Sequence, residues 1–470
     1  MSKTGVTLGF MAKRLSGNEA ATWTNWAGSV TSRPHIRQTP SDPIALHRIL
    51  DQCVAQGYNL RVVGAGHSFS PAAATNGALI SLDNFDQLER ITPIPETDGE
   101  CAVTVGAGIR LHELNTLLAM HGLAMANLGD IDRQSIAGAI STGTHGTGLS
   151  LTGFSAQVLG LRLMLASGEV VETSPTQNPH LFQAARLSLG TIGIVIALTL
   201  RAVPAFLLHA RETPLPLGEV MEHLDGADGY PENNDHFEFY WFPGSSSTLS
   251  KFNNRVPNST PLTAQDGNPA ANLARSARLW LDDELLSNGV FQFTNSLTSR
   301  VPGLTNTINT VASKALSARE YVAASHDVFV SPRRVRFHEM EYALDRADAR
   351  EVLTDYLKFM SRKQYAVSFP IEVRFAAKDD VWLSTAYERE SIYIAVHQYQ
   401  NSPYHDYFAA AEQIFKAAGG RPHWGKMHTL SHDDLRERYP RLGDFTALRS
   451  ELDPTGVFAN YYTNTVFGRV

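Results

Sequence analysis

The sequence predicts an α+β protein of two domains, and three observations lead to this prediction. The chain has 470 residues, which at roughly 150 residues per domain allows two or three domains. Helical and strand-like hydrophobic patterns are interspersed up to Pro204. After Pro204 the character changes, because aromatic strand candidates and a long polar stretch take over. Such a mixture predicts mixed helices and sheets divided between two units.

The elements of the first part can be located from capping and turn residues. Between Ser41 and Val54 apolar residues recur at helical spacing, with Ser41 or Asp42 as N-cap and Gly57 just past the end. A second helix is expected over Leu111–Met120. Four segments have the composition of short or buried strands: Leu60–Val63, Ala102–Val105, Val158–Leu165 and Ile192–Leu200.

The second part is expected to contain strands separated by a long loop. The strand candidates are His236–Phe242, Ser368–Phe375 and Ser391–Tyr399. The segment Gly244–Asn272 is rich in Ser, Asn, Thr and Pro, which predicts a loop. An apolar stripe over Leu304–Leu316 predicts a helix packed on the core, because no basic face suited to a membrane surface accompanies it.

The composition excludes several classes of protein. Forty Lys and Arg against 47 Asp and Glu give a formal net charge of −7, which argues against a nucleic-acid or anionic-membrane partner. A hydrophobic content of 43% with 19% charged residues is typical of a globular chain. Only Cys53 and Cys101 are present, so we expect neither a disulfide framework nor a metal cluster, and we expect both thiols to be buried.

The sequence predicts a cytoplasmic protein without a membrane span. The apolar stretch Val6–Met11 is too short for a secretory signal and is followed by Lys13 and Arg14. The uncharged run over residues 134–161 is crowded with Gly, Ser and Thr and contains His145, so we expect a tightly folded loop region there.

Three stretches of small and hydroxylated residues predict a site for a large planar cofactor. In Gly64–Pro71, which follows a strand candidate, glycines allow backbone N–H groups to face a pyrophosphate. This stretch is not a Rossmann fingerprint, and taken alone it also fits a plain glycine turn with an incidental histidine. The other two stretches run from Asn127 to Gly148 and over Gly190–Val195. Together the three favour a bound cofactor.

These stretches are part of a longer series of motifs. The series is GAGHSFSP, STGTHGTG, GTIGIV, the pair Glu372 and Arg374, HWGK and DPTGVFAN, in that order. It resembles the FAD-dependent aldonolactone and alditol oxidases of the vanillyl-alcohol oxidase flavoprotein superfamily. The resemblance runs from about Trp23 to Asn460 and is weakest between Gly244 and Ser325.

The resemblance implies a two-domain fold of the vanillyl-alcohol oxidase type, with an inserted cap domain. We expect an FAD-binding domain over residues 20–205, a substrate (cap) domain over 206–420 and a C-terminal segment over 421–470 that completes the FAD and active site. The resemblance also implies that FAD is attached covalently through His67. The implied cofactor-binding residues are Val62, Val63, Gly64, Ala65, Gly66, His67, Ser68, Gly129, Asp130, Ser135, Gly138, Thr142, Gly143, Thr144, His145, Ile194, His423 and Lys426.

The chemistry of flavin-dependent alcohol oxidation needs a hydride acceptor, a base for the hydroxyl proton and cations near the reduced ring. Glu372 and Arg374 alternate on one predicted strand and therefore face the same side. The resemblance implies that these two residues, Lys426 and His397 are catalytic. From the residues alone, Glu372 and Arg374 also fit a structural ion pair, and Lys426 also fits a solvated loop cation.

The expected substrate is a small polyhydroxylated molecule. The resemblance implies an oxidase of a sugar-1,4-lactone such as gulono-, galactono- or arabinono-lactone, which passes a hydride from the C2 alcohol to flavin N5 and is reoxidised by O2 to give H2O2. An alditol oxidase, or a lactone dehydrogenase with another electron acceptor, is the alternative. A flavin carrier or sugar-binding protein without turnover does not account for the complete set of candidate catalytic residues.

Three positions bear on the substrate and the acceptor. Asp130 stands where several relatives carry Ser, and Tyr399 stands where the alditol oxidases carry Thr. The identity of the substrate therefore cannot be inferred from any one relative. Gly129 resembles the lactone oxidases and leaves room for O2 at the flavin, which favours an oxidase. The oligomeric state is left open by the sequence.

Overall fold

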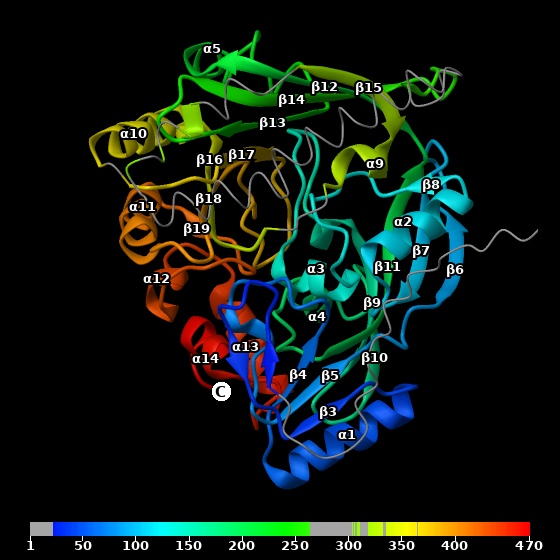
Figure 1. Ribbon diagram of the computed structural model, residues 1–470. Helices are drawn as coiled ribbons and strands as arrows, with labels where there is room; N and C mark the ends of the chain where they lie inside the picture. The colour runs from blue at the N-terminus through cyan, green and yellow to red at the C-terminus, as the bar shows by residue number, and fades with distance from the viewer. Residues whose placement is uncertain are drawn as a thin grey trace, which may run out of the picture.

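The structure is a computed structural model that describes residues 22–263, 303, 305, 308–310, 318–331, 335–363 and 365–470. Within these residues the strands form an eight-stranded and a six-stranded antiparallel sheet, a three-stranded parallel sheet and a two-stranded ladder, β1 (Trp23–Thr24) with β2 (Thr31–Ser32). Helices accompany the sheets, so the predicted α+β class is confirmed (Figure 1).

The parallel sheet carries the first glycine-rich loop at the end of its edge strand. Its strands, in the order β3-β5-β4, are β3 (Ile36–Gln38), β5 (Ala78–Ser81) and β4 (Leu60–Val63). The helix α1 (Pro43–Gln56) connects β3 to β4 and confirms the predicted helix. The Asp42 carboxylate caps it by accepting the Ala45 N–H at 2.8 Å, and Gly57 ends it at φ 66°. The chain then leaves β4 directly into Gly64.

The six-stranded sheet has the order β10-β9-β11-β7-β6, with β8 paired to β11. Its strands are β6 (Leu88–Pro93), β7 (Cys101–Gly106), β8 (Leu123–Ala124), β9 (Val158–Met164), β10 (Val170–Thr173) and β11 (Ile194–Pro204). These strands and the helix α2 (Leu111–Met120) confirm the elements predicted for this part. Cys53 is buried as expected, whereas Cys101 is partly exposed because burial fades toward the start of β7.

Two short helices border this sheet, α3 (Ile136–Thr142) and α4 (Pro179–Ala185). The helix α3 lies inside the uncharged run that we predicted to be loop, so that prediction is wrong in part. Ser135 starts the helix, because its hydroxyl accepts the Gly138 N–H at 3.3 Å. Gly143 ends it at φ 78°.

The eight-stranded sheet has the order β15-β12-β14-β13-β17-β18-β16-β19. Its strands are β12 (Leu207–Pro216), β13 (His236–Trp241), β14 (Ser247–Val256), β15 (Arg319–Ala324), β16 (Phe337–Asp345), β17 (Ile371–Ala376), β18 (Ser391–Tyr399) and β19 (Arg421–Pro422). The helices α10 (Ala349–Arg362) and α11 (His405–Ala417) lie beside it, and the short helices α5 (Leu217–Glu222) and α9 (Ser325–Phe329) flank β12.

Two expectations for this part need correction. The predicted loop Gly244–Asn272 contains β14, which pairs with β12 on one side and β13 on the other. Its polar side chains are satisfied inside the sheet, since Thr248 and Ser250 are fully buried and their hydroxyls hydrogen-bond at 2.9 Å. The predicted strand over 368–375 begins only at Ile371, directly after Pro370. The predicted helix Leu304–Leu316 lies largely outside the described residues.

The C-terminal segment returns to the first glycine-rich loop. It contains α12 (His432–Arg436), α13 (Leu442–Leu452) and α14 (Tyr461–Phe467), drawn in orange and red beside the blue N-terminal strands in Figure 1. The Leu60 N–H donates to the Val457 carbonyl at 2.7 Å, and the Phe69 N–H donates to the Gly425 carbonyl at 2.7 Å. The HWGK motif, residues 423–426, is therefore held against the loop that contains His67.

In the described parts of the chain, no helix combines the length and apolar composition that a membrane crossing requires.

Candidate active site

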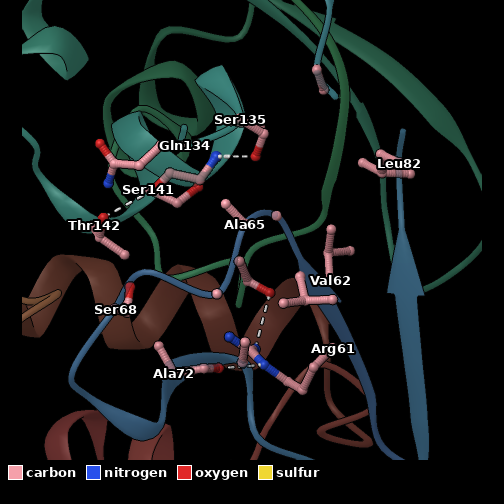
Figure 2. A pocket seen from close by; sticks show the side chains of 18 of the residues that line it. Arg61, Val62, Ala65, Ser68, Ala72, Leu82, Gln134, Ser135, Ser141 and Thr142 are labelled. Carbon is pink, nitrogen blue, oxygen red and sulfur yellow. Dashed lines mark hydrogen bonds between the residues drawn. The ribbon is translucent and has the colours of Figure 1, made fainter. Parts of the chain in front are cut away.

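A cavity lies between the first glycine-rich loop, the helix α3 and the turn before β11 (Figure 2). Eleven of the predicted cofactor residues line it: Val62, Val63, Gly64, Ala65, Gly66, His67, Ser68, Ser135, Gly138, Thr142 and Ile194. A side chain at Gly64 would clash with the Ser135 hydroxyl, and Gly66 has φ 71°. Without side chains at these glycines, the loop can lie close to α3 and expose its backbone N–H groups to the cavity. This arrangement suits an extended ligand that is held by backbone N–H groups.

Arg61 forms the floor of this cavity, although we did not predict it as a site residue. Its guanidinium donates to the Ala72 carbonyl at 2.8 Å and to the carbonyls of Leu189 and Phe458. Burial is the main reason that its pKa falls to about 9, with Arg449 adding to the effect. Arg61 thus ties β4, the turn before β11 and the C-terminal segment together beneath the cavity.

A second cavity begins where the first one ends, and His67, Ser68 and Thr142 line both. The four predicted catalytic residues Glu372, Arg374, His397 and Lys426 line the second cavity together, as do five predicted cofactor residues: Gly129, Asp130, Thr144, His145 and His423. Residues from the N-terminal part, the eight-stranded sheet and the C-terminal segment meet here.

His67 lies at the junction of the two cavities. Its ring stacks on Trp26 with a centroid separation of 5.3 Å. Its Nδ1 atom is buried and has no hydrogen-bond partner among the described residues. Burial, reinforced by the positive charges of Lys426 and Arg110, lowers the His67 pKa to about 4. The ring is therefore neutral at pH 7 and its nitrogen lone pair is available.

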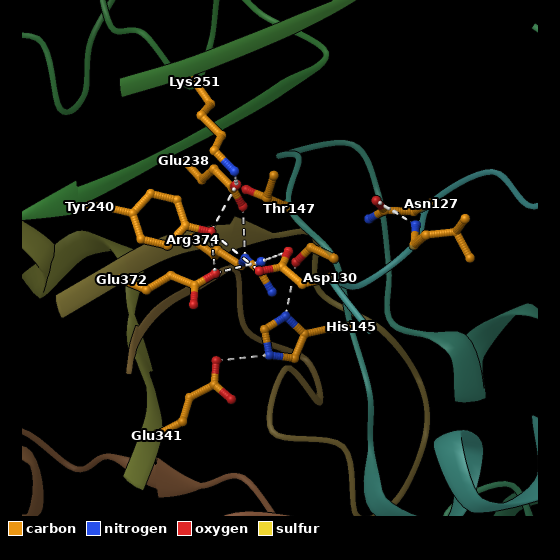
Figure 3. A network of polar contacts seen from close by, with 12 residues as sticks. Asn127, Asp130, His145, Thr147, Glu238, Tyr240, Lys251, Glu341, Glu372 and Arg374 are labelled. Carbon is orange, nitrogen blue, oxygen red and sulfur yellow. Dashed lines mark hydrogen bonds and ion pairs between the residues drawn. The ribbon is translucent and has the colours of Figure 1, made fainter. Parts of the chain in front are cut away.

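Arg374 is the centre of a buried set of charges that we call the Arg374 cluster (Figure 3). The members of the cluster are Asp130, Glu238, Tyr240, Lys251, Glu372 and Arg374. The Arg374 Nε donates to Glu238 at 2.8 Å, and its Nη2 contacts the carboxylates of Asp130 and Glu372. Lys251 lies 3.3 Å from the other Glu238 oxygen.

The Tyr240 hydroxyl lies among three carboxylates of this cluster. It is 3.1 Å from Glu372, 3.1 Å from Glu238 and 3.3 Å from Asp130. Burial, followed by the negative charge of Asp130 and Glu238, raises the Tyr240 pKa well above its usual range. Tyr240 therefore stays protonated and acts as a hydrogen-bond donor.

Two further carboxylates, Glu339 and Glu341, were not predicted. They alternate on β16, so both face the second cavity. The Glu339 carboxylate lies 2.5 Å from the Lys426 Nζ and 3.4 Å from the His397 Nε2. Burial alone would raise the Glu339 pKa, but Lys426 and His397 outweigh burial and lower it to about 2.

The Glu341 carboxylate lies 3.2 Å from the His145 Nε2. Burial opposes ionisation here too, but His145 and His423 hold the Glu341 pKa well below its usual range. The His145 Nδ1 donates to the Gly146 carbonyl at 2.9 Å, because a carbonyl can only accept. The Nε2 atom is the one that faces the Glu341 carboxylate. His397 repeats this arrangement, since its Nδ1 donates to the Pro370 carbonyl at 2.9 Å.

The ligand atoms of His145, Glu341 and His423 lie within 4.8 Å of one another, a spacing that a metal ion could use. However, the His423 Nδ1 accepts the Gly425 N–H at 3.0 Å. Burial is the main cause that lowers the His423 pKa to about 4, so the ring is neutral and its Nε2 carries the proton. Neither ring nitrogen of His423 then offers a free lone pair to a metal.

Two residues emphasised by the sequence lie outside both cavities. Gly143 acts as the cap that ends α3. Tyr399 packs in a buried apolar cluster with Phe337 and Phe369, and its hydroxyl accepts from the Asn401 side chain at 3.4 Å. Tyr399 therefore lies behind the wall of the second cavity, where we had expected it to face substrate hydroxyls.

Comparison with known proteins places this geometry in a family. Residues 34–174 match the model of an FAD binding domain, and residues 198–466 match the model of D-arabinono-1,4-lactone oxidase. The chain belongs to the D-arabinono-1,4-lactone oxidase family. Members of this family are FAD oxidoreductases that act on CH–OH groups. The resemblance drawn from the sequence motifs is thus confirmed.

Relatives in this family align over nearly the whole chain. The L-gulono-1,4-lactone dehydrogenase of Mycobacterium tuberculosis is 37% identical, with 95% of this chain and 99% of the relative covered. The L-gulonolactone oxidase of Bos taurus is 32% identical, with coverage of 96% and 100%. The alditol oxidase of a Streptomyces species is 28% identical, with coverage of 93% and 97%.

Among solved structures, the cholesterol oxidase from B. sterolicum has a TM-score of 0.72 over 95% of this chain and 96% of its own, at 17% identity. A solvent-stable cholesterol oxidase has a TM-score of 0.73 at 19% identity, with coverage of 95% and 97%. At these identities the likeness concerns the fold, which is the predicted two-domain flavoprotein fold.

Proposed function

We propose that this chain is an FAD-dependent oxidase of a sugar-1,4-lactone such as gulono-, galactono- or arabinono-lactone. The observation that carries the proposal is the junction of the two cavities at His67. One cavity has the backbone-lined shape that suits the dinucleotide, and the other gathers charged and hydrogen-bonding side chains that suit a polyhydroxylated substrate. Bound FAD supplies the hydride acceptor, flavin N5, and the substrate supplies the hydride from its C2 alcohol.

The side chains of the second cavity have complementary tasks in this proposal. Glu372 and Arg374 orient the substrate hydroxyls, because both lie buried in the cavity wall and contact each other. Lys426 places a positive charge beside the flavin, with Glu339 fixing its position at 2.5 Å. His397 faces the substrate from β18.

The proposal includes a covalent bond between His67 and the flavin 8α-methyl group. Three features of His67 support it. The ring lies where the two cavities join, Nδ1 is buried without a partner among the described residues, and the lowered pKa keeps the ring neutral and nucleophilic.

We assign O2 as the electron acceptor, with H2O2 as its product. Gly129 supports this choice, because it lines the second cavity without a side chain. A dehydrogenase that uses another acceptor is the second candidate, and it is favoured by the name of the relative that is 37% identical. An alditol oxidase is the third, from the name of the relative that is 28% identical.

One pair of measurements on the purified protein tests the proposal. Anaerobic bleaching of the flavin absorbance is followed with a panel of aldonolactones and alditols, and H2O2 release is then measured in air. We expect lactones to bleach the flavin and air to restore its colour with one H2O2 per substrate. Bleaching by alditols alone would contradict the assignment of a lactone as the substrate. Bleaching without H2O2 release in air would contradict the assignment of O2 as the electron acceptor.

We further propose the domain limits implied by the motifs: 20–205 for FAD binding, 206–420 for the cap and 421–470 for the segment that completes the site. The change from the six-stranded to the eight-stranded sheet between Pro204 and Leu207 supports the first limit. Limited proteolysis with mass spectrometry would test it. A cytoplasmic location stays a prediction from the sequence.

A further inference from the structure

The turn between β1 and β2, residues 25–30, is held in shape by its own contacts. The Asn25 backbone N–H donates to the Val30 carbonyl at 3.0 Å, and the Asn25 side-chain oxygen accepts the Val30 N–H at 3.0 Å. Gly28 has φ 76°, which suits a tight turn. Ala27 is buried in an apolar cluster. None of the residues predicted for the site lies in this turn, although it is well anchored.

The turn grips the first glycine-rich loop on both sides of His67. Before the histidine, the Gly66 carbonyl accepts the Trp26 backbone N–H at 2.8 Å. After the histidine, the Ser68 carbonyl accepts the Asn25 side-chain amide at 2.9 Å. The backbone that carries His67 is therefore fixed to a second segment of the chain at the positions directly before and after the histidine.

The Trp26 side chain also holds the His67 ring itself. The two rings are stacked, with a centroid separation of 5.3 Å and 25° between their planes. The same indole meets the edges of Phe69 and Phe337 at 6.3 Å and 5.4 Å, which fixes its own position. A histidine ring otherwise rotates over a broad range about its Cβ–Cγ bond. Here such a rotation would break the stacking, so Trp26 selects one orientation of the ring.

The proposed covalent bond depends on that orientation. It forms between a ring nitrogen of His67 and the 8α carbon of the flavin. Its formation removes one hydrogen from the imidazole ring and one from the methyl carbon, leaves the flavin reduced by two electrons, and needs O2 to reoxidise it with release of H2O2. Misplacement of reacting atoms by about 1 Å can slow a reaction by about a hundredfold. A ring that is already aimed at the methyl group avoids this loss.

We propose that Trp26 is a positioning residue that holds His67 for covalent attachment of FAD, and that Asn25 assists it through the loop backbone. The inference rests on the proposed function, because it concerns the bond proposed there. Trp26 is not among the residues that line either cavity, whereas His67 lines both. Trp26 therefore acts on attachment through His67, and its loss should leave the non-covalent binding of FAD intact.

The test follows attachment of FAD to the full-length chain produced under riboflavin starvation. FAD is added in air, samples are acid-precipitated at intervals, and the flavin fluorescence of the pellet gives the rate of attachment. Equilibrium dialysis of His67→Ala and of each variant in that background gives the affinity for non-covalent FAD. We expect Trp26→Leu to attach FAD about tenfold more slowly or worse, with an unchanged dissociation constant. Trp26→Phe should stay close to the parent rate, because it restores an aromatic face.

Two further variants separate positioning from a general loosening of the fold. Asn25→Asp keeps an oxygen for the Val30 N–H but loses the amide that donates to Ser68, so it should also slow attachment, even if Trp26→Leu fails to fold. Thr24→Val removes an exposed hydroxyl that hydrogen-bonds to Thr31 in the same hairpin and should attach FAD at the parent rate.

Three outcomes would overturn the inference. They are parent rates in both Trp26→Leu and Asn25→Asp, rates that fall only in proportion to FAD affinity, and equal slowing by Thr24→Val. If the FAD of the parent itself stays acid-soluble, the proposed covalent bond is wrong instead.

Discussion

Replacing Glu339 by Gln should destabilise the protein by about 3 kcal/mol at pH 7. The Glu339 pKa is about 2 instead of the ordinary 4.5, because the pairing with Lys426 and His397 outweighs the cost of burial. A difference of this size means that the ionised carboxylate stabilises the folded state by roughly 3 kcal/mol relative to the protonated carboxyl group. The carboxylate is only 5% exposed, so solvent screening does not reduce this figure much.

The pH dependence of this effect has a definite sign. The folded-state pKa is lowered, so the stabilisation is complete above pH 4.5 and is lost as the pH falls through 2. At pH 3 a little under half of it should remain. Equilibrium urea unfolding of parent and Glu339→Gln, followed by tryptophan fluorescence at pH 7, 4.5 and 3, measures the difference directly. Equal stabilities at pH 7, or a gap that does not narrow at pH 3, would refute the reasoning.

The same variant tests whether Glu339 acts through Lys426. If it does, Glu339→Gln should slow anaerobic flavin reduction by up to about a hundredfold, because the ammonium group loses its anchor. In a Lys426→Met background the same change should have little further effect on reduction. Additive losses in this double-mutant cycle would mean that Glu339 acts independently of Lys426.

The remaining predictions concern the flavin and the reacting groups. His67→Ala should release FAD on acid precipitation, whereas the parent pellet should stay yellow; acid-soluble FAD from the parent would rule out the covalent bond. Glu372→Gln and Arg374→Met should each lower kcat/KM by about 2 to 4 kcal/mol in transition-state stabilisation while FAD stays bound, and near-parent rates in both would refute their assignment. Gly129→Ala adds a methyl group 3.0 Å from the His145 carbonyl oxygen at an ordinary φ. In stopped-flow measurements it should slow reoxidation by O2 more than reduction, and equal losses would indicate crowding of His145.

The parts of the structure that could be predicted from the sequence depend on local contacts. The helix α1 carries its own start signal in Asp42 and its own stop signal in Gly57. The loop from Gly64 could be predicted from its glycines, because Gly66 has φ 71° and a side chain at Gly64 would meet the Ser135 hydroxyl. Lys426 was found through its motif and the family resemblance, since nothing local distinguishes it from a solvated loop cation.

Glu339 and Glu341 show why the rest of the site could not be predicted. Along β16 they alternate with Met340 and Tyr342, a pattern that indicates one buried face and one face in water. In the structure both faces are buried, because the HWGK segment covers the acidic face. The partners of these carboxylates lie far away along the chain, Lys426 after β19 and His145 before β9. No local pattern encodes such pairings.

The long-range ion pairs also explain how one site can be assembled from three parts of the chain. A buried carboxylate is costly unless a cation meets it with good geometry. Three carboxylates of the second cavity meet a basic side chain from another segment. Asp130 of the N-terminal part contacts Arg374 of β17, Glu341 of β16 contacts His145, and Glu339 of β16 contacts Lys426 of the C-terminal segment. An arrangement in which one segment is undocked would leave a buried charge unpaired. Arg374 and Lys426, which are proposed to act on the substrate and the flavin, therefore also hold separate segments of the chain together at the site. Their substitution should loosen those contacts as well as slow the reaction.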